Sequence, residues 1–204
     1  MIPLFPPLPS RRYDIIAADP PWEVKTYSPK GWEKAPQKHY ACHPIERICT
    51  LDVASVARRD AWLFLWTSAP LLDRSFDVLR AWGFRYCTRI AWRKVTRAGA
   101  VRTGPGFVVR TQHEDILIGK RGGPAYAGAL ESILDAAEGG MFDGVARRHS
   151  EKPEEFYAAV ERFKPTAFRL DLFSRTNRPG WDCWGDQAGK FGVARTSQGE
   201  ASDA

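Results

Sequence analysis

Asp19, Pro20, Pro21 and Trp22 follow one another in the sequence and carry groups that suit a single task. An amine attached to an aromatic ring is a weak nucleophile because its lone pair is delocalised into the ring. Hydrogen bonds from its two N–H groups to a carboxylate and a carbonyl would hold the amine and favour a more pyramidal nitrogen. Asp19 offers the carboxylate, Pro20 offers a carbonyl held rigid by the proline pair, and Trp22 offers a flat stacking face. We therefore expect a catalytic motif for a planar amine.

The Asp-Pro-Pro-Trp motif directly follows a segment with the pattern of a buried strand. Tyr13 to Ala18 is short and apolar and is bounded by prolines, which is typical of a parallel strand buried on both faces. Similar segments predict further strands at residues 61–66, 84–92, 114–119 and 167–173. Helical segments alternate with these strands, which predicts an open, mostly parallel α/β sheet. Such sheets bind ligands at the carboxyl ends of their strands, where the motif would lie.

Three segments have apolar residues at helical spacing. Residues 44–59 fit one broken helix or two short ones, because polar residues interrupt the pattern. Residues 71–82 predict a helix that Gly83 ends. Ser150 is expected as the N-cap of a third helix with an acidic first turn. The expected buried side of that helix consists of Phe156, Tyr157, Val160 and Phe163. Residues 122–149 are rich in Gly and Ala and fit no single element.

The remaining segments predict irregular structure. Residues 1–12 are rich in proline and are expected to form an extended arm, and residues 188–204 have few apolar side chains and are expected to form a flexible tail. The folded domain would therefore span residues 13–187. Residues 23–43 and 93–111 predict long loops, which are often functional in compact domains.

The composition is that of one globular domain. The chain has 204 residues, of which 44% are hydrophobic and 26% charged, and this excludes a fusion of two enzymes and a wholly disordered chain. The longest apolar run, Ala61–Trp66, is too short to cross a bilayer, and the N-terminus lacks the pattern of a secretion signal, so we expect a cytoplasmic protein.

The spacing of Cys42, Cys49, Cys87 and Cys183 suggests neither a zinc site nor a disulfide framework. Reduced, mostly buried thiols are expected.

The Asp-Pro-Pro-Trp motif and several motifs after it resemble one known family. This is the family of adenine-N6 methyltransferases related to the catalytic subunit of the messenger-RNA adenosine methyltransferase, often labelled MT-A-seventy. The resemblance extends from about Tyr13 to Gln187. The motifs that carry it are Ile16-Ala17-Ala18-Asp19-Pro20-Pro21-Trp22, Leu63-Phe64-Leu65-Trp66, Trp92-Arg93-Lys94, His113-Glu114, His149-Ser150-Glu151-Lys152-Pro153, Leu170-Asp171-Leu172-Phe173-Ser174-Arg175, Pro179-Gly180-Trp181 and Trp184-Gly185-Asp186-Gln187. Their common order makes the resemblance specific.

The resemblance implies a fold, a cofactor and a reaction. The fold would be a Rossmann-like class I methyltransferase, a mostly parallel sheet with helices on both faces, circularly permuted so that the amine-binding motif precedes the cofactor-binding strand. The cofactor would be S-adenosyl-L-methionine. The reaction would be a direct methyl transfer, without a metal, to the N6 amine of adenine in a flipped or single-stranded nucleotide. The net charge of +6, from 30 basic and 24 acidic residues, suits a nucleic-acid partner.

The resemblance also implies roles for individual residues. Asp19, Pro20, Pro21 and Trp22 would be catalytic. The residues expected at the cofactor, with Asp171 at its ribose, are Ala18, Asp19, Tyr40, Asp171, Arg175, Asn177, Arg178, Asp186 and Gln187. The residues expected at the target nucleotide are Trp22, Lys30, Tyr40, Lys94 and His113. The residues expected to clamp phosphates from the two long loops are Lys25, Lys30, Lys34, Lys38, Arg97, Arg102 and Arg110.

Each assignment has an alternative. Asp-Pro-Pro-Trp could be a turn that ends a strand, with Trp22 capping the core, and Lys94 and His113 could be structural. DNA is the favoured substrate because no RNA-binding module or zinc finger is recognisable, and RNA is the alternative. An inactive nucleic-acid-binding subunit and the methylation of a protein amide are two further alternatives. We also leave open a homodimer or a partner subunit, and we expect no contact with a membrane.

Overall fold

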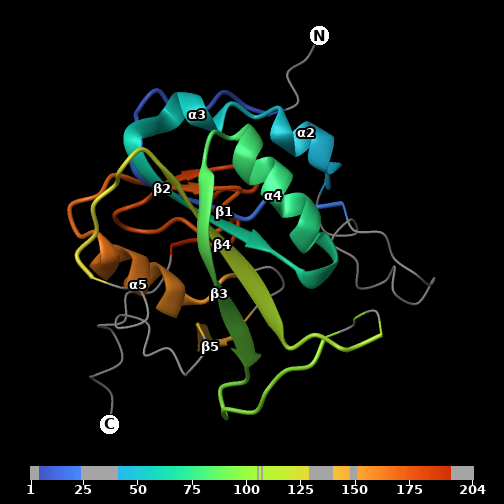
Figure 1. Cartoon of the computed structure of the whole chain (residues 1–204). Helices are drawn as coiled ribbons and strands as arrows, with labels where there is room; N and C mark the ends of the chain where they lie inside the picture. The colour runs from blue at the N-terminus through green and yellow to red at the C-terminus, as the bar shows by residue number, and fades with distance from the viewer. Residues whose placement is uncertain are drawn as a thin grey trace.

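The computed structural model describes residues 5–23, 41–104, 106, 108–128, 140–147 and 151–193, and these contain one seven-stranded sheet. The strands are β1 (Tyr13–Ala18), β2 (Ala57–Thr67), β3 (Arg85–Val95), β4 (His113–Arg121), β5 (Met141–Val145), β6 (Arg169–Leu172) and β7 (Asp182–Trp184). Their order across the sheet is β5-β3-β4-β2-β1-β6-β7 (Figure 1).

The sheet is mixed because one strand runs against the others. β1 pairs in parallel with β2 and β6, β6 with β7, and β3 with β5. β4 lies between β2 and β3 and is antiparallel to both. All the other strands therefore share one direction, as the alternation of strands and helices predicted. The ends of β1, β3 and β6 and the start of β4 lie at the same edge of the sheet, which we call the carboxyl edge.

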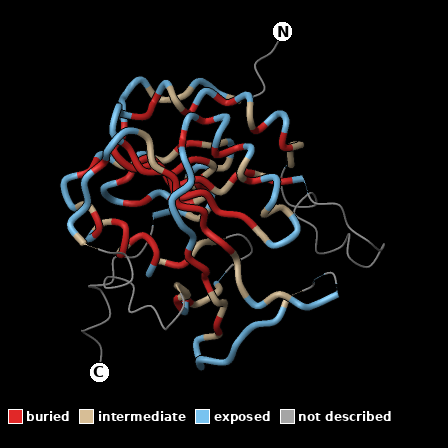
Figure 2. Tube along the Cα trace, in the orientation of Figure 1, coloured by how far each residue is buried: buried red, intermediate tan, exposed pale blue. Residues whose placement is uncertain are grey.

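Helices cover both faces of the sheet, as expected. They are α2 (Ile45–Cys49), α3 (Val53–Val56), the 3-10 helix η2 (Ala69–Leu71), α4 (Leu72–Ala81) and α5 (Glu154–Phe163). Successive side chains of β1 point to opposite faces, so Ile16 and Ala18 pack with α2, α3 and α4 while Ile15 and Ala17 pack with α5. The buried trace in Figure 2 follows the strands between these two layers. None of the helices in the described residues is long and apolar enough to span a membrane.

The predicted helices form, with one correction. Residues 44–59 form two short helices, and α4 ends at Gly83, whose φ of +82° suits a residue without a side chain. The apolar side of α5 is buried as predicted. However, α5 begins at Glu154 with Pro153 as its N-cap residue, so the expected N-cap at Ser150, which lies outside the described residues, is wrong. The helix starts later because the backbone at Pro153 is extended, with ψ of 141°.

Short strands account for the other corrections. β5 lies in the segment to which no element was assigned, and β7 lies after residues 167–173, the last of the predicted strands. β2 begins at Ala57, four residues before the predicted strand, so the end of the expected helical segment 44–59 is extended instead. β5 pairs with β3, which is distant in the sequence, and β7 pairs with β6, from which a loop separates it. Local periodicity cannot reveal such pairing.

The arm and the cysteines also differ in detail from expectation. Residues 5–12 contain no helix or strand, but Phe5 packs edge-on against His43 and Phe173, and Trp184 Nε1 donates a hydrogen bond to the carbonyl of Pro7 at 2.9 Å. The arm therefore lies against the core. All four cysteines are free thiols, and none is fully buried; Cys87 is exposed on β3. The expectation of mostly buried thiols is wrong.

Candidate active site

Charged side chains gather at the carboxyl edge of the sheet. Asp19 directly follows β1, and its N–H donates to the carbonyl of Leu172 in β6 at 3.3 Å. Asp171 lies on β6 beside Ala17 of β1. Glu114 is the second residue of β4, which enters the sheet at this edge because it runs antiparallel to β2 and β3. The strand directions thus bring together three carboxylates that are far apart in the sequence.

An ionic chain joins Asp19 to Lys94 across the carboxyl edge. Lys152 precedes α5, and its side chain is only 8% exposed. Its Nζ lies 2.9 Å from Asp19 Oδ2 and 3.0 Å from Glu114 Oε2. The second oxygen of Glu114, Oε1, accepts a hydrogen bond from Nζ of Lys94 near the end of β3. We call Asp19, Lys152, Glu114 and Lys94 the ionic chain.

The ionic chain keeps its buried members charged. Burial alone would raise the pKa of Glu114, but the positive charges of Lys152 and Lys94 outweigh burial and lower this pKa to about 2. Burial also opposes the charged form of Lys152, yet Asp19 and Glu114 raise its pKa above the ordinary value. At neutral pH an ammonium group is therefore fixed between two carboxylates, one of which begins the Asp-Pro-Pro-Trp motif.

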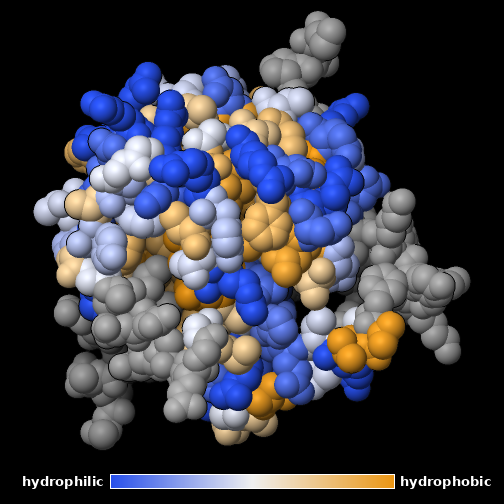
Figure 3. All heavy atoms as spheres, in the orientation of Figure 1, coloured by the Kyte–Doolittle hydropathy of each residue, from blue (hydrophilic) through white to orange (hydrophobic). Residues whose placement is uncertain are grey.

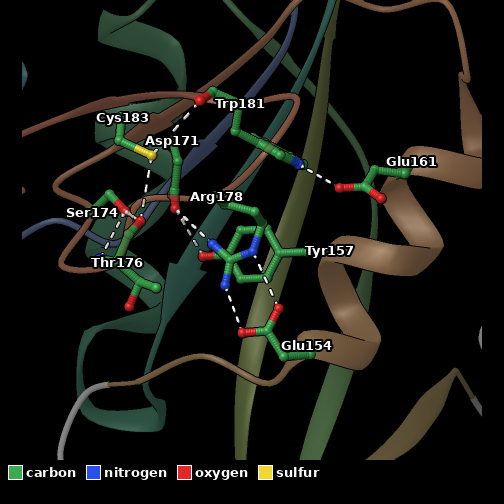
Figure 4. A network of polar contacts seen from close by, with 9 residues as sticks. All are labelled: Glu154, Tyr157, Glu161, Asp171, Ser174, Thr176, Arg178, Trp181 and Cys183. Carbon is green, nitrogen blue, oxygen red and sulfur yellow. Dashed lines mark hydrogen bonds and ion pairs between the residues drawn. The ribbon is translucent and has the colours of Figure 1, made fainter. Parts of the chain in front are cut away.

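A second polar cluster surrounds Asp171 (Figure 4). Tyr157 of α5 donates its hydroxyl to Asp171 Oδ2 at 3.0 Å, and Arg178 Nη1 lies 3.6 Å from the same oxygen. The guanidinium carbon of Arg178 lies 3.3 Å from the centre of the Tyr157 ring, and its Nε and Nη2 bind both oxygens of Glu154. Burial raises the pKa of Asp171, and Arg178 opposes that rise, so that the pKa is about 6. Asp171 is thus ionised at neutral pH and protonated in mild acid.

A small pocket lies between the ionic chain and the Asp171 cluster. Its lining residues are Asp19, Glu151, Lys152, Tyr157, Asp171, Phe173, Ser174, Arg175, Thr176 and Arg178. The structure therefore brings together four of the residues expected at the cofactor: Asp19, Asp171, Arg175 and Arg178. The lining combines carboxylates, cations and hydroxyl groups, which suits a polar ligand with both amine and carboxylate groups.

The other residues expected at the cofactor lie elsewhere or outside the described residues. Ala18 points into the core under α4. Asn177 lines a different pocket, next to Tyr13 and Asp182. Asp186 and Gln187 lie in the turn after β7 and do not line the pocket beside Asp19. The remaining expected residues, Tyr40 with Lys25, Lys30, Lys34 and Lys38, lie outside the described residues.

The Asp-Pro-Pro-Trp motif forms a tight turn, which backbone hydrogen bonds and the buried Trp22 side chain hold in place. Trp22 N–H donates to the carbonyl of Pro20 at 2.8 Å, and the Pro21 carbonyl accepts from His43 N–H at 2.8 Å. The Trp22 ring is 7% exposed, packs in the core, and donates its Nε1 to the carbonyl of Trp66 at 3.2 Å. Trp22 therefore fixes the turn in place and presents little of its ring for stacking. A carbonyl oxygen has two lone pairs, so Pro20 retains one for a substrate N–H.

Two of the residues expected at the nucleotide lie beside the ionic chain. Lys94 belongs to it, and His113 Nε2 lies 3.7 Å from Asp115 Oδ2 at the start of β4. The sequence prediction missed Glu114, Lys152 and Tyr157 as site residues. Glu114 and Lys152 stand in motifs that carry the family resemblance, and Tyr157 was expected only to pack on the buried side of α5. The sequence carried no signal for Glu114, because the start of a parallel strand would lie at the opposite edge, and only the antiparallel direction of β4 brings Glu114 to the carboxyl edge.

The mixed seven-stranded sheet with helices on both faces is consistent with an α/β methyltransferase fold. The profile of the MT-A70 family, the MT-A-seventy family above, matches residues 13–187. The chain belongs to this family of adenine-N6 methyltransferases.

Relatives of two kinds are similar to the chain. It is 28% identical to the type II methyltransferase M.MunI of Mycoplasma sp., over 98% of this chain and 88% of the relative. It is 28% identical to an N(6)-adenosine-methyltransferase MT-A70-like protein of Arabidopsis thaliana, over 86% of this chain and 24% of the relative. It is 26% identical to the N(6)-adenosine-methyltransferase catalytic subunit METTL3 of Homo sapiens, over 86% of this chain and 28% of the relative. The chain thus spans most of the first relative and about a quarter of the other two.

Proposed function

We propose that this protein transfers the methyl group of S-adenosyl-L-methionine to the N6 amine of adenine in DNA. One observation carries the proposal: Asp19 both begins the Asp-Pro-Pro-Trp turn and lines the charged pocket. A ligand in the pocket and an amine held by the turn would therefore meet at the same carboxylate. Such a meeting of two reactants is what a direct transfer requires. We also propose that the fold is Rossmann-like with a permuted order of motifs.

The residues of the pocket fit S-adenosyl-L-methionine by their chemistry. The cofactor carries an amine, a carboxylate and a ribose diol. Asp171 is a buried acceptor suited to the ribose hydroxyls, and Asp19 is an acceptor suited to an amine. The Nη1 atom of Arg178 is buried and has no hydrogen-bond partner within the described part of the chain. A buried donor of this kind costs free energy unless a ligand or water accepts its hydrogen bond.

The protein's own residues position the amine and prepare it for attack. When bound, S-adenosyl-L-methionine would supply an electrophilic methyl group on a positively charged sulfur. The N6 amine would gain this methyl group and give up one proton, which the Asp19 carboxylate would accept and pass to water. The Asp19 carboxylate and the Pro20 carbonyl would each accept an N–H of the amine, which reduces the delocalisation of its lone pair. Lys152 holds Asp19 in place through Oδ2.

The relatives and the charge support DNA as the polymer. The relative that matches this chain over most of both lengths is a type II methyltransferase, whereas the adenosine methyltransferases match it over about a quarter of their own length. The net charge of +6 favours binding to phosphates. The adenine would have to leave its stack, or be single-stranded, to reach Asp19. RNA is the second candidate, because those adenosine methyltransferases are also relatives.

Methyl incorporation into matched DNA and RNA oligonucleotides tests the proposal. We expect label from S-adenosyl-L-methionine to enter DNA, and label in RNA alone would overturn the choice of polymer. Calorimetry with S-adenosyl-L-methionine addresses the alternative of an inactive subunit. A protein that shifts DNA in a gel but binds no S-adenosyl-L-methionine would be a binding subunit, and the enzymatic proposal would fail.

A further inference from the structure

The described part of the connection between β3 and β4 is a basic hairpin that begins at the ionic chain. The N–H of Arg102 donates to the carbonyl of Lys94 at 2.7 Å, and the N–H of Lys94 donates to the carbonyl of Gln112 at 3.0 Å. Farther out, Gly104 N–H donates to the carbonyl of Thr111 at 2.7 Å. Lys94 therefore contacts both strands of the hairpin base while its side chain binds Glu114.

The tip of this hairpin presents apolar side chains to solvent. Val108 is fully exposed and Val109 is 70% exposed. Figure 3 shows hydrophobic atoms that project over the β3–β4 connection beside hydrophilic neighbours. Val108 also has φ of +59°, a left-handed conformation that is strained for a β-branched residue. A protein gains no stability from two exposed valines on a strained turn, so packing within this chain does not explain them.

The charges around the tip favour a nucleic acid as its partner. Residues 93–112 contain five basic residues and no acidic one. Arg93 pairs with Asp143 and Lys94 with Glu114. Arg97, Arg102 and Arg110 are exposed, and no carboxylate among the described residues pairs with them. A partner protein that covered this loop would have to be acidic, whereas the phosphates of a nucleic acid provide that charge in every sequence.

We propose that Val108 and Val109 form a wedge that enters the base stack of duplex DNA while the three arginines bind the flanking phosphates. The inference rests on the proposed function and adds to it the step that takes adenine out of the duplex. Apolar side chains inserted between base pairs unstack them, and this lowers the cost of extruding a neighbouring base. The base of the hairpin at Lys94 is linked to Asp19 through the ionic chain, so the wedge extends from the edge of the sheet that holds the Asp-Pro-Pro-Trp turn.

Fluorescence of 2-aminopurine tests the wedge without requiring methyl transfer. Several adenines of a duplex are replaced by 2-aminopurine, whose emission rises when it is unstacked. We expect wild-type protein to raise the emission, and the double variant Val108→Ser, Val109→Ser to bind the duplex without raising it. Val101→Ser is the matched control, because Val101 is 40% exposed on the same connection but lies near the hairpin base. Binding by the wild type without a rise in emission would overturn the wedge.

Methyl incorporation into native and heat-denatured plasmid separates the wedge from the reaction. We expect the double variant to lose about tenfold or more on native plasmid, and to stay within about twofold on denatured plasmid, where stacking no longer opposes access. Equal losses on both forms, or none on either, would contradict the wedge. A change of molar mass in light scattering with unchanged DNA activity would identify the tip as a protein contact instead. Raised emission without any methyl transfer by the wild type would overturn the proposed function alone.

Discussion

At the residue scale, Lys152 is the residue on which the site depends. It connects Asp19 of the Asp-Pro-Pro-Trp turn to Glu114 of β4, and through Glu114 to Lys94. A buried ion pair contributes modest net stability, but removal of one partner leaves an uncompensated charge. The ionic chain is therefore better understood as a device that fixes the position of Asp19 than as a source of stability.

The substitution Glu114→Gln should destabilise the fold and change its response to acid. We expect a loss of about 3 kcal/mol at neutral pH, because Lys152 loses one of its two carboxylates. The pKa of Glu114 is lowered from 4.5 to about 2 in the folded protein, so its contribution is present above pH 4.5 and is lost as the pH falls toward 2. Urea denaturation at several pH values should show the difference from wild type shrinking in acid. Glu155→Gln, on the exposed side of α5, is the control and should change stability by less than about 0.5 kcal/mol.

The affinity for S-adenosyl-L-methionine should depend on pH through Asp171. Its pKa is raised to about 6 in the folded protein, so the carboxylate that would accept the ribose hydroxyls is lost below this pH. We expect the dissociation constant to rise about tenfold for each pH unit below 6. Asp171→Asn should bind more weakly at pH 7 and show no such slope. A wild-type affinity that is constant from pH 7 to pH 5 would remove Asp171 from the site.

The sequence predicted the position of Asp19 but not what surrounds it. Asp19 could be placed because it directly follows an apolar segment that forms β1, and strand direction alone then puts it at the carboxyl edge. Lys152 and Glu114 could not be assigned because their partners are distant in the sequence. Trp22 was expected as a stacking face, but the structure packs its ring in the hydrophobic core, where Nε1 donates a hydrogen bond to the carbonyl of Trp66.

At the element scale, α5 and the segment before it set the geometry of the site. Phe156 is fully buried and packs edge-on against Phe64 and Trp66 of β2. Tyr157, the next residue, reaches Asp171, and Lys152 precedes the helix by two residues. The long strands and the helices α4 and α5 were predictable from periodicity, whereas β5 and β7 depend on pairing with β3 and β6.

Loss of the Phe156 ring should weaken both the fold and the site. We expect Phe156→Ala to cost about 3 to 5 kcal/mol in the free energy of unfolding, because it leaves a cavity between α5 and the sheet. Glu155→Ala, one residue away on the exposed side, should cost less than about 0.5 kcal/mol. Denaturant titration measures both values. If the two variants were equally stable, α5 would not be packed as described.

At the scale of the whole molecule, the basic hairpin should govern how salt affects DNA binding. Each arginine that neutralises a phosphate releases counterions, so the affinity falls as salt rises. We expect Arg97→Ala to lower the slope of log affinity against log salt concentration by about 1. Arg80→Ala is the matched control, since Arg80 is exposed on α4 and pairs with Asp77. Identical slopes for wild type and Arg97→Ala would exclude this residue from the contact with phosphates.

In the proposed reaction, Asp19 holds the N6 amine of adenine during methyl transfer. The most direct measurement incubates plasmid DNA that lacks N6-methyladenine with S-adenosyl-L-methionine and protein, digests the DNA to nucleosides, and identifies the methylated product by mass. We expect N6-methyladenine with the wild type and with Asp73→Ala, which removes an exposed carboxylate of α4, and none with Asp19→Ala. A methyl group on another nucleoside, or undiminished N6-methyladenine with Asp19→Ala, would contradict the proposed reaction.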